Sequence, residues 1–203
     1  MVNNEASIYK APTVYKQAGG GGNSGGVFIG SQYYATKELN GIVWICSDLL
    51  YDDNLTDAGV NPISPTTPAY WNLEGDPCNN HYFYNHAAIE YFIQNNVFPD
   101  GWRVPSVADY TTLKDNYTAY EIRSRYGWNA KLGTNETGLN FIGAGFFTES
   151  GNPKFYNKGD LNNLWTSDLD NGLFRAMQLS VGIGFITEPT TQRGYSLRLC
   201  KDA

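Results

Sequence analysis

Four aspartates stand close together near the start of the chain: Asp48, Asp52, Asp53 and Asp57. Calcium is bound by six to eight oxygen atoms, several of them from carboxylates, so this group could supply part of a calcium site. Such residues are equally typical of a charged loop in contact with water. We expect the solvated loop, and therefore no metal at this position.

The histidines and cysteines are the other residues suited to metal or redox chemistry. His81 and His86 are five positions apart, but no third zinc ligand stands at a characteristic spacing, so we expect them at the surface or at a helix start. Cys46, Cys78 and Cys200 show no Cys-x-x-Cys spacing. They are predicted to be small buried apolar side chains, with one disulfide as the open alternative.

The sequence contains no recognisable catalytic motif. No Ser, His and Asp stand in an arrangement typical of nucleophilic catalysis, and the glycines between positions 19 and 26 are not followed by Lys-Ser or Lys-Thr and a helix. A phosphate-binding loop is therefore not expected. The sequence predicts a protein that is not an enzyme and needs no cofactor.

Size and charge narrow the function classes further. The chain has 203 residues and a net charge of −6, with scattered basic residues, which argues against a nucleic-acid surface. The longest apolar stretches, such as residues 41–46, are too short to span a membrane. Charged residues make up only 17% and aromatic residues 15%, a balance that favours short strands and packed loops.

Residues 1–26 differ from the rest and are expected to form an extended arm with a Gly-rich linker. Four apolar residues of the arm could pack on a partner or add a strand to it: Ile8, Tyr9, Val14 and Tyr15. An end without structure or function is the other interpretation. Residues 27–203 are predicted to form one folded domain.

Two helices are predicted in the middle of the chain. Apolar residues recur at helical spacing within residues 84–97. Ser106 suits the N-cap of a second helix, and Asp109 suits the positive end of that helix. The buried stripe of this helix is expected to comprise Val107, Tyr110, Leu113 and Tyr117.

Short strands are predicted on both sides of the helices. Residues 27–30 and 41–45 are expected to be strands with a turn near 37–40, followed by a long loop at 52–80. Later strands are predicted at residues 141–147, 155–156, 163–167, 173–179, 184–187 and 195–199. This order predicts an α+β domain whose N-terminal and C-terminal strands close together.

Several blocks resemble a known family in their order and spacing. They are residues 29–49, Tyr-Asn at 84–85 with the following helix, Gly-Trp-Arg-Val-Pro-Ser at 101–106, Gly-Ala-Gly at 143–145, Leu-Trp-Thr-Ser at 164–167 and Tyr-Ser-Leu-Arg-Leu-Cys-Lys-Asp at 195–202. Together they are similar to the Fibrobacter succinogenes major paralogous domain family over residues 27–202. The resemblance implies a C-type-lectin-like domain with two helices and a twisted antiparallel sheet meander, related to variable receptor-binding proteins of phages.

The chain departs from the family pattern at informative positions. Members usually carry a Cys before the Pro-x-Gly-Trp element, placed to pair with the C-terminal Cys. Here Phe98 stands at that position, so Cys200 is expected to have lost its partner. Exported members also carry leaders, and the first residues of this chain lack that pattern. The Glu188-Pro189-Thr190 triplet lacks the third oxygen ligand of a calcium-dependent lectin.

The late strands and their loops form the exposed recognition face in the fold that the resemblance implies. Here that region mixes aromatic, amide and hydroxyl groups, which is typical of an adaptable binding surface. The predicted ligand-binding residues are Asp168, Asp170, Asn171, Phe174, Arg175, Gln178, Thr190, Gln192 and Arg193. The alternative is that Phe174, Met177 and Leu179 are core residues that alternate with solvent-facing ones.

These observations predict a non-enzymatic binding or structural protein. The preferred interpretation is a phage virion fibre or decoration protein, whose lectin-like head recognises a glycan or protein of a bacterial surface. The arm is expected to bind other virion or surface proteins, and the protein to form a homo-oligomer, because repeated weak contacts then add up. The alternative is a bacterial cell-surface or secreted lectin-like module whose leader was removed.

Overall fold

The computed structural model describes residues 25–59, 61–72, 81–149, 155–188 and 193–203. Within these ranges the chain forms a mixed structure of few helices and several small, mainly antiparallel sheets, which confirms the α+β class. Three helices are described, where the sequence predicts two. The predicted anchoring residues Ile8, Tyr9, Val14 and Tyr15 lie outside the described ranges.

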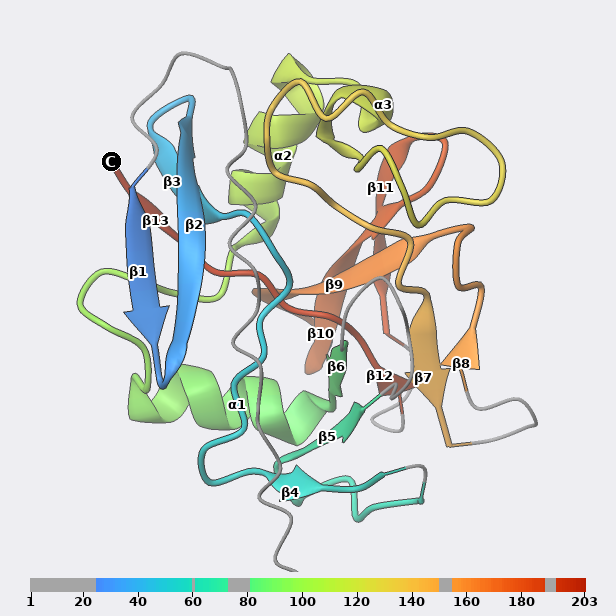
Figure 1. Cartoon of the computed structure of the whole chain (residues 1–203). Coiled ribbons are helices and arrows are strands. Elements are labelled where there is room, and N and C mark those ends of the chain that lie inside the picture. Colours follow the sequence, from blue (N-terminus) through green and yellow to red (C-terminus); the bar gives the residue numbers. More distant parts are fainter. Residues whose placement is uncertain (1–24, 60, 73–80, 150–154, 189–192) are drawn as a thin grey trace, which may run out of the picture.

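The largest sheet joins the two ends of the folded body. Its strands, in spatial order, are β1 (Gly26–Ile29), β2 (Gln32–Leu39), β3 (Ile42–Ile45) and β13 (Cys200–Asp202), and all neighbours are antiparallel. Cys200 pairs with Trp44. The expected closure of N-terminal and C-terminal strands is therefore confirmed (Figure 1).

A tight turn connects β2 to β3. Asn40 and Gly41 both have positive φ, 55° and 78°. This backbone suits the two central positions of a type I′ hairpin turn, where Asn-Gly is the favoured pair. The turn predicted near residues 37–40 is wrong in extent, because β2 continues through Lys37 to its end at Leu39.

The two predicted helices begin at polar caps. α1 (His86–Asn95) follows Asn85, whose side chain accepts a hydrogen bond from the backbone of the first turn. α2 (Val107–Asn116) follows Ser106, and the Ser106 side chain and Asp109 form a reciprocal capping box. The predicted N-cap of the second helix is confirmed.

The buried side of α2 is narrower than predicted. Tyr110 and Leu113 are buried, whereas Val107 and Tyr117 are only partly covered. α3 (Ala119–Ile122) follows directly and has its own capping box. It was not predicted, because a helix of four residues is too short to show a periodic pattern of apolar residues.

Three further sheets contain three strands each. They are β11 (Ile183–Thr187), β10 (Leu173–Leu179) and β9 (Asn162–Asp170); β4 (Thr56–Asp57), β5 (Ala69–Asn72) and β6 (Tyr82–Tyr84); and β12 (Arg193–Gly194), β7 (Phe146–Thr148) and β8 (Phe155–Tyr156).

Three sequence expectations change as a result. The loop predicted at 52–80 contains β4 and β5, and residues 141–145 precede β7 instead of forming it. Of the strand predicted at 195–199, only Tyr195 and Ser196 pair, each in an isolated bridge before β13.

The sheet of β9, β10 and β11 separates two hydrophobic cores. Trp165 and Ala176 face the first core, which α1 covers, and Leu164 and Met177 face the second core, which α2 covers. In Figure 1, α1 lies below β9 and β10, and α2 lies above them. Since both faces of this sheet are buried, a recognition site here must lie at its ends and edges.

Candidate functional site

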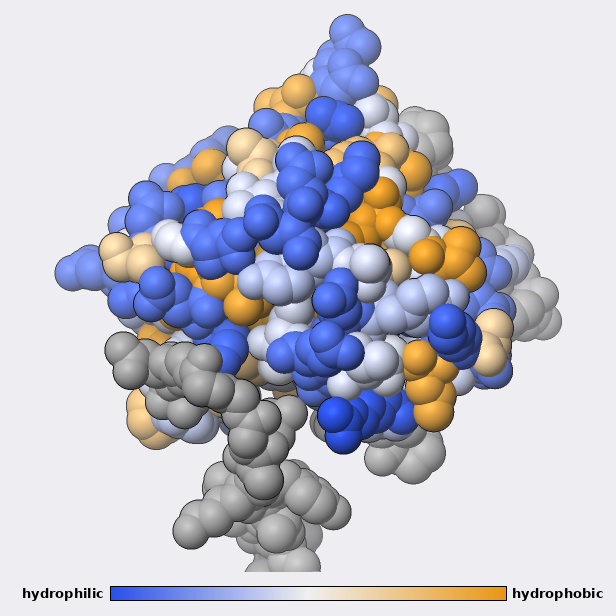
Figure 2. Space-filling model, turned by 90° about the horizontal axis from the view of Figure 1, so that it is seen from above, coloured by the Kyte–Doolittle hydropathy of each residue, from blue (hydrophilic) through white to orange (hydrophobic). Residues whose placement is uncertain are grey.

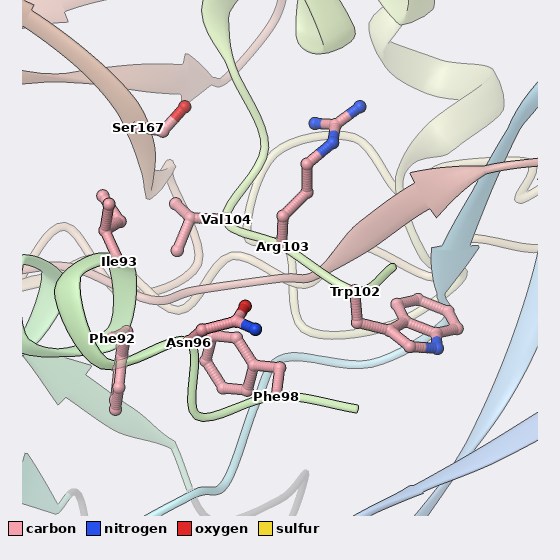
Figure 3. Close-up of a pocket in the computed structure, with 8 residues that line it drawn as sticks. All are labelled: Phe92, Ile93, Asn96, Phe98, Trp102, Arg103, Val104 and Ser167. Carbon is pink, nitrogen blue, oxygen red and sulfur yellow. The ribbon is translucent and has the colours of Figure 1, made fainter. Parts of the chain in front are cut away.

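A pocket opens between α1, the segment 98–104 and β9. Its volume is about 240 Å³. The family-like Gly-Trp-Arg-Val-Pro-Ser block supplies three of its residues. The lining consists of Phe92, Ile93, Asn96, Phe98, Trp102, Arg103, Val104 and Ser167 (Figure 3).

The pocket has an apolar floor and a partly apolar mouth. Phe92, Phe98 and Val104 are buried, and the rings of Phe92 and Phe98 lie 5.2 Å apart. Ile93 follows Phe92 on α1 and is 44% exposed, so its side chain borders the opening. Phe98 stands where the family resemblance implies a Cys, and the structure uses its ring as pocket floor.

A bulge in β9 positions the polar side of the pocket. Trp165 pairs with Ala176 and Leu169 pairs with Phe174, so three β9 residues oppose Arg175 alone. An irregularity of this kind bends a strand and changes the direction of its side chains. Sequence periodicity cannot reveal it, because the strand signal continues on both sides.

The bulge is fixed to the start of α2 by two hydrogen bonds. The Ser167 N–H donates to Pro105 O over 2.8 Å, and the Val107 N–H donates to Asp168 Oδ2 over 2.6 Å. A carboxylate is favoured at this position because the helix N-terminus carries partial positive charge. Asp168 therefore serves the structure of the site, and Ser167 joins the pocket lining.

Arg103 lies at the pocket wall and binds two aspartates on the side away from the pocket. Its Nη2 donates to Asp109 Oδ1 and to Asp202 Oδ1, each over 3.0 Å, and Nη1 donates to Asp109 Oδ2. Its backbone also pairs with Cys200 of β13. The guanidinium is thus engaged with carboxylates, and in Figure 3 its side chain extends away from Phe98 and Asn96.

The pKa values of Arg103 and Asp109 reflect their ion pair. The hydrogen bond to Asp109 raises the pKa of Arg103 above its usual range, against the effect of burial. Burial alone would raise the pKa of Asp109, but hydrogen bonds from Arg103 and Ser106 outweigh it and lower that pKa. Both groups are therefore charged at neutral pH.

The chemistry of the lining suits binding. Among the described lining residues, Ser167 is the only one with a hydroxyl, and none is a histidine or a carboxylate that could activate it. Asn96 and Ser167 offer neutral hydrogen-bonding groups beside an otherwise apolar surface. A mainly apolar pocket with few polar groups is the usual form of a binding site.

The β9–β10 hairpin carries some of the predicted ligand-binding residues, three and four positions beyond the lining residue Ser167 of β9. Asn171 is exposed in the turn with φ of 53°, and Asp170 accepts hydrogen bonds from Asn171 Nδ2 and Thr187 Oγ1. Leu169, which was not predicted, is 56% exposed on the same hairpin. The hairpin tip thus combines an apolar side chain with carboxylate and amide groups.

Three other predicted residues lie elsewhere on β10. Phe174 is 3% exposed and packs against His86, with ring centroids 4.6 Å apart, so its placement on a recognition face is corrected to the core. Arg175 is partly covered and lies over Phe185. Gln178 stands at the opposite end of β10 from the hairpin tip and donates to Asn163 Oδ1.

The remaining predicted residues do not extend the hairpin surface. Arg193 belongs to β12, where Nε lies 3.5 Å from Oε1 of the buried Glu188. Thr190 and Gln192 lie outside the described residues. The predicted set is therefore not one continuous face, and ligand contact by its members stays a prediction.

A buried ionic cluster elsewhere in the molecule was not predicted. Arg198 Nε donates to Asp48 Oδ1 over 2.8 Å, and His81 Nδ1 lies 3.6 Å from Asp48 Oδ2. Arg198 also donates to three backbone carbonyl oxygens, those of Ile45, Leu139 and Asn140. Every member is buried, so Asp48 is not part of a solvated loop and His81 is not at the surface.

Asp48 keeps its charge in this interior. Burial alone would raise its pKa, but the charge of Arg198 and the neighbouring His81 side chain outweigh burial, and the pKa lies below its usual value. His86 begins a helix as expected, but it is buried as well. The fold buries these groups, and none of them lines the pocket described above.

Metal and membrane sites were also considered. In the ranges that the structure covers, no three His, Cys, Asp or Glu side chains are grouped to hold a metal. Cys46 and Cys200 are free, and Cys78 falls outside those ranges. None of the described helices has the length and apolar character needed to cross a membrane. Figure 2 looks onto the end that carries α2 and α3, where apolar residues appear only in separate areas.

Comparison with known proteins gives one finding. The sequence matches the family model described as the Fibrobacter succinogenes major domain over residues 27–201, which include the pocket, the β9–β10 hairpin, Arg103 and Arg198. This confirms the resemblance noted in the sequence. No curated protein and no solved structure matches the chain.

Proposed function

The chain belongs to the Fibrobacter succinogenes major domain family, and we propose that it is a non-enzymatic binding domain with a C-type-lectin-like fold. The observation that carries the proposal is the mainly apolar pocket between α1, residues 98–104 and Ser167 of β9. The paired terminal strands, the two main helices and the late sheet support the lectin-like architecture.

The contact surface in this proposal has a defined composition. Ile93 of α1 lines the pocket and is exposed, Leu169 is an exposed apolar residue two positions beyond the lining residue Ser167, and Asp170 and Asn171 add polar groups at the hairpin tip. Rigid apolar anchors surrounded by small polar groups are typical of protein surfaces that recognise other molecules. The ligand class is a glycan or protein of a bacterial surface.

We place the domain in a phage virion, as a fibre or decoration protein that acts as a homo-oligomer. Phe98 supports this placement, because it replaces the Cys of exported family members and leaves Cys200 as a free thiol. The second candidate is a cell-surface or secreted bacterial module. Localising the native protein in purified particles or on cells separates the two.

Binding to intact gut-type bacteria tests the function. Labelled full-length protein is compared with Ile93→Ser at the pocket mouth and with the matched control Val181→Ser, which alters a 75% exposed aliphatic residue on the β10–β11 turn. We expect the wild type and the control to label the same strains. Loss of an anchor residue costs more than about 1 kcal/mol, so Ile93→Ser should weaken labelling roughly fivefold or more.

Equal labelling by the two variants would refute a role for the pocket. Absence of labelling by all three proteins on every strain would count against the cell-surface ligand itself.

A further inference from the structure

The size and lining of the pocket indicate what it accommodates. Sites for small molecules usually measure about 300–1,000 Å³, and this pocket measures about 240 Å³. It therefore fits one inserted side chain better than a whole drug-sized ligand. Phe92 and Phe98 form an aromatic floor, against which another ring or a long aliphatic side chain can pack.

The lining favours an uncharged group in the pocket. Among the described lining residues Arg103 alone carries a charge, and its guanidinium binds Asp109 and Asp202 on the side away from the pocket (Figure 3). A charge on the floor would lose its water without gaining an opposite charge, which is costly. Asn96 and Ser167 offer neutral hydrogen-bonding groups.

Glu90 lies on the face of α1 that borders the pocket. His86, Glu90 and Ile93 are spaced by four and then three positions, so they follow one face of the helix. At one end of this row the His86 ring packs against Phe174, and at the other end Ile93 lines the pocket. The Glu90 side chain is 49% exposed, so it places a carboxylate in water one helical turn from the pocket lining.

A second exposed carboxylate, that of Asp100, stands in the pocket wall. It lies in a tight turn between the lining residues Phe98 and Trp102. The Trp102 N–H closes this turn by donating to Pro99 O over 2.9 Å. We call Glu90 and Asp100 the acidic rim.

The surrounding basic groups do not balance the acidic rim. His86 Nδ1 lies 3.7 Å from Glu90 Oε1, but burial lowers the pKa of His86, so the imidazole is neutral at neutral pH. Arg103 meets two carboxylates, and that group therefore keeps an excess negative charge. The Lys201 ammonium lies over the Trp102 ring and offsets one charge. The apolar pocket thus stands in a negatively charged surface.

We propose that the pocket takes one uncharged apolar side chain from a partner protein, in a segment where lysines or arginines flank that side chain. This proposal rests on the proposed binding function and narrows its ligand to a basic protein segment. The apolar side chain supplies the anchoring, as a buried residue at the centre of an interface commonly does. The flanking cations supply steering and selectivity, because each exposed ion pair adds little affinity. An anionic polysaccharide would meet like charge at the acidic rim.

Peptide titrations of the full-length, isotopically labelled protein test the proposal. The probe is a blocked pentapeptide of one phenylalanine between two pairs of lysines. It is compared with peptides in which alanine replaces the phenylalanine or glutamates replace the lysines. Binding is followed by NMR through the backbone amides of Ile93, Asn96 and Gly101. We expect the lysine–phenylalanine peptide to shift these signals, and each altered peptide to bind roughly fivefold or more weakly.

Two double variants separate the acidic rim from the overall charge. Glu90→Gln with Asp100→Asn should weaken binding of the lysine–phenylalanine peptide roughly threefold or more and make binding less sensitive to salt. Asp115→Asn with Glu136→Gln removes the same charge from exposed positions that do not line the pocket, and should bind like the wild type. Equal weakening in both double variants would overturn the proposal, because overall charge would then select the peptide.

Other results would also overturn the proposal. Binding of the glutamate peptide as tightly as the lysine peptide would exclude selection by the acidic rim. Shifts of the same signals by polygalacturonate, without any by the lysine–phenylalanine peptide, would assign the pocket to an acidic glycan. If bacteria are labelled but this peptide does not bind, only the present proposal fails. If the peptide binds and no strain is labelled, the cell-surface ligand fails instead.

Discussion

Arg198 and Arg103 both link distant parts of the chain through aspartates, but they do so in opposite surroundings. The Arg198 side chain is fully buried with Asp48, whereas that of Arg103 is 40% exposed between Asp109 and Asp202. Arg198 ties the C-terminal segment to the chain beyond β3, and Arg103 ties the pocket wall to α2 and β13.

The difference predicts different roles. Removing one member of a buried ion pair leaves a charge without compensation and is strongly destabilising, even where the intact pair adds little net stability. A pair in which one partner is exposed to water, as Arg103 is, is partly screened and contributes less. We therefore assign Arg198 to the integrity of the fold, and Arg103 to the shape of the binding pocket.

The largest expected effect is that of Asp48→Ala. The substitution leaves Arg198 buried without its carboxylate, so the free energy of unfolding should fall by about 3–5 kcal/mol. Urea denaturation followed by tryptophan fluorescence measures the change. The double variant Asp48→Ala with Arg198→Met should be more stable than Asp48→Ala alone; if it is less stable, uncompensated charge is not the cause.

A smaller loss is expected for Asp109→Ala. This variant loses the reciprocal cap of α2 and the partner of Arg103, so the free energy of unfolding should fall by about 1–2 kcal/mol. Asp115→Ala, on the exposed side of the same helix, is the matched control and should stay within about 0.5 kcal/mol of wild type. Equal losses of unfolding free energy in Asp109→Ala and Asp115→Ala would show that the cap and the ion pair of Asp109 add no stability.

A further, smaller effect is expected on how the stability of Asp109→Asn depends on pH. The pKa values of Asp48 and Asp109 are lowered in the folded protein, so their stabilisation is complete above the unfolded pKa of about 3.9 and is lost as pH falls through the folded values. Asp109→Asn should therefore show a weaker decline in stability below about pH 4 than wild type. Urea midpoints measured between pH 2 and 7 check this, and parallel profiles would contradict it.

The smallest effect is expected for Asp202→Asn. Asp202 is 86% exposed, so its bond to Arg103 should contribute less than about 1 kcal/mol. The urea midpoint should barely move, and adding salt should reduce even this small difference. If the free energy of unfolding fell as much as in Asp109→Ala, Asp202 and not Asp109 would be the main partner of Arg103.

Local signals explain what the sequence could predict. Ser106 and Asp109 are three residues apart and form the cap that their types suggest, and the closure of terminal strands follows from strong strand signals at both ends. The contact of Arg198 with Asp48 spans 150 positions, and no local pattern marks it. The β9 bulge also escaped prediction, because it depends on how Ser167 is held by Pro105 of another element.

The role assigned to Arg103 can be tested most directly with Arg103→Met, which keeps an unbranched apolar stem and removes the charge. Urea stability and labelling of intact bacteria are measured on the same preparation. The account predicts a stability loss of no more than about 2 kcal/mol, clearly below that of Asp48→Ala, together with a labelling loss of several-fold. Unchanged labelling with a stability loss equal to that of Asp48→Ala would contradict it, and would make Arg103 a second fold-holding arginine.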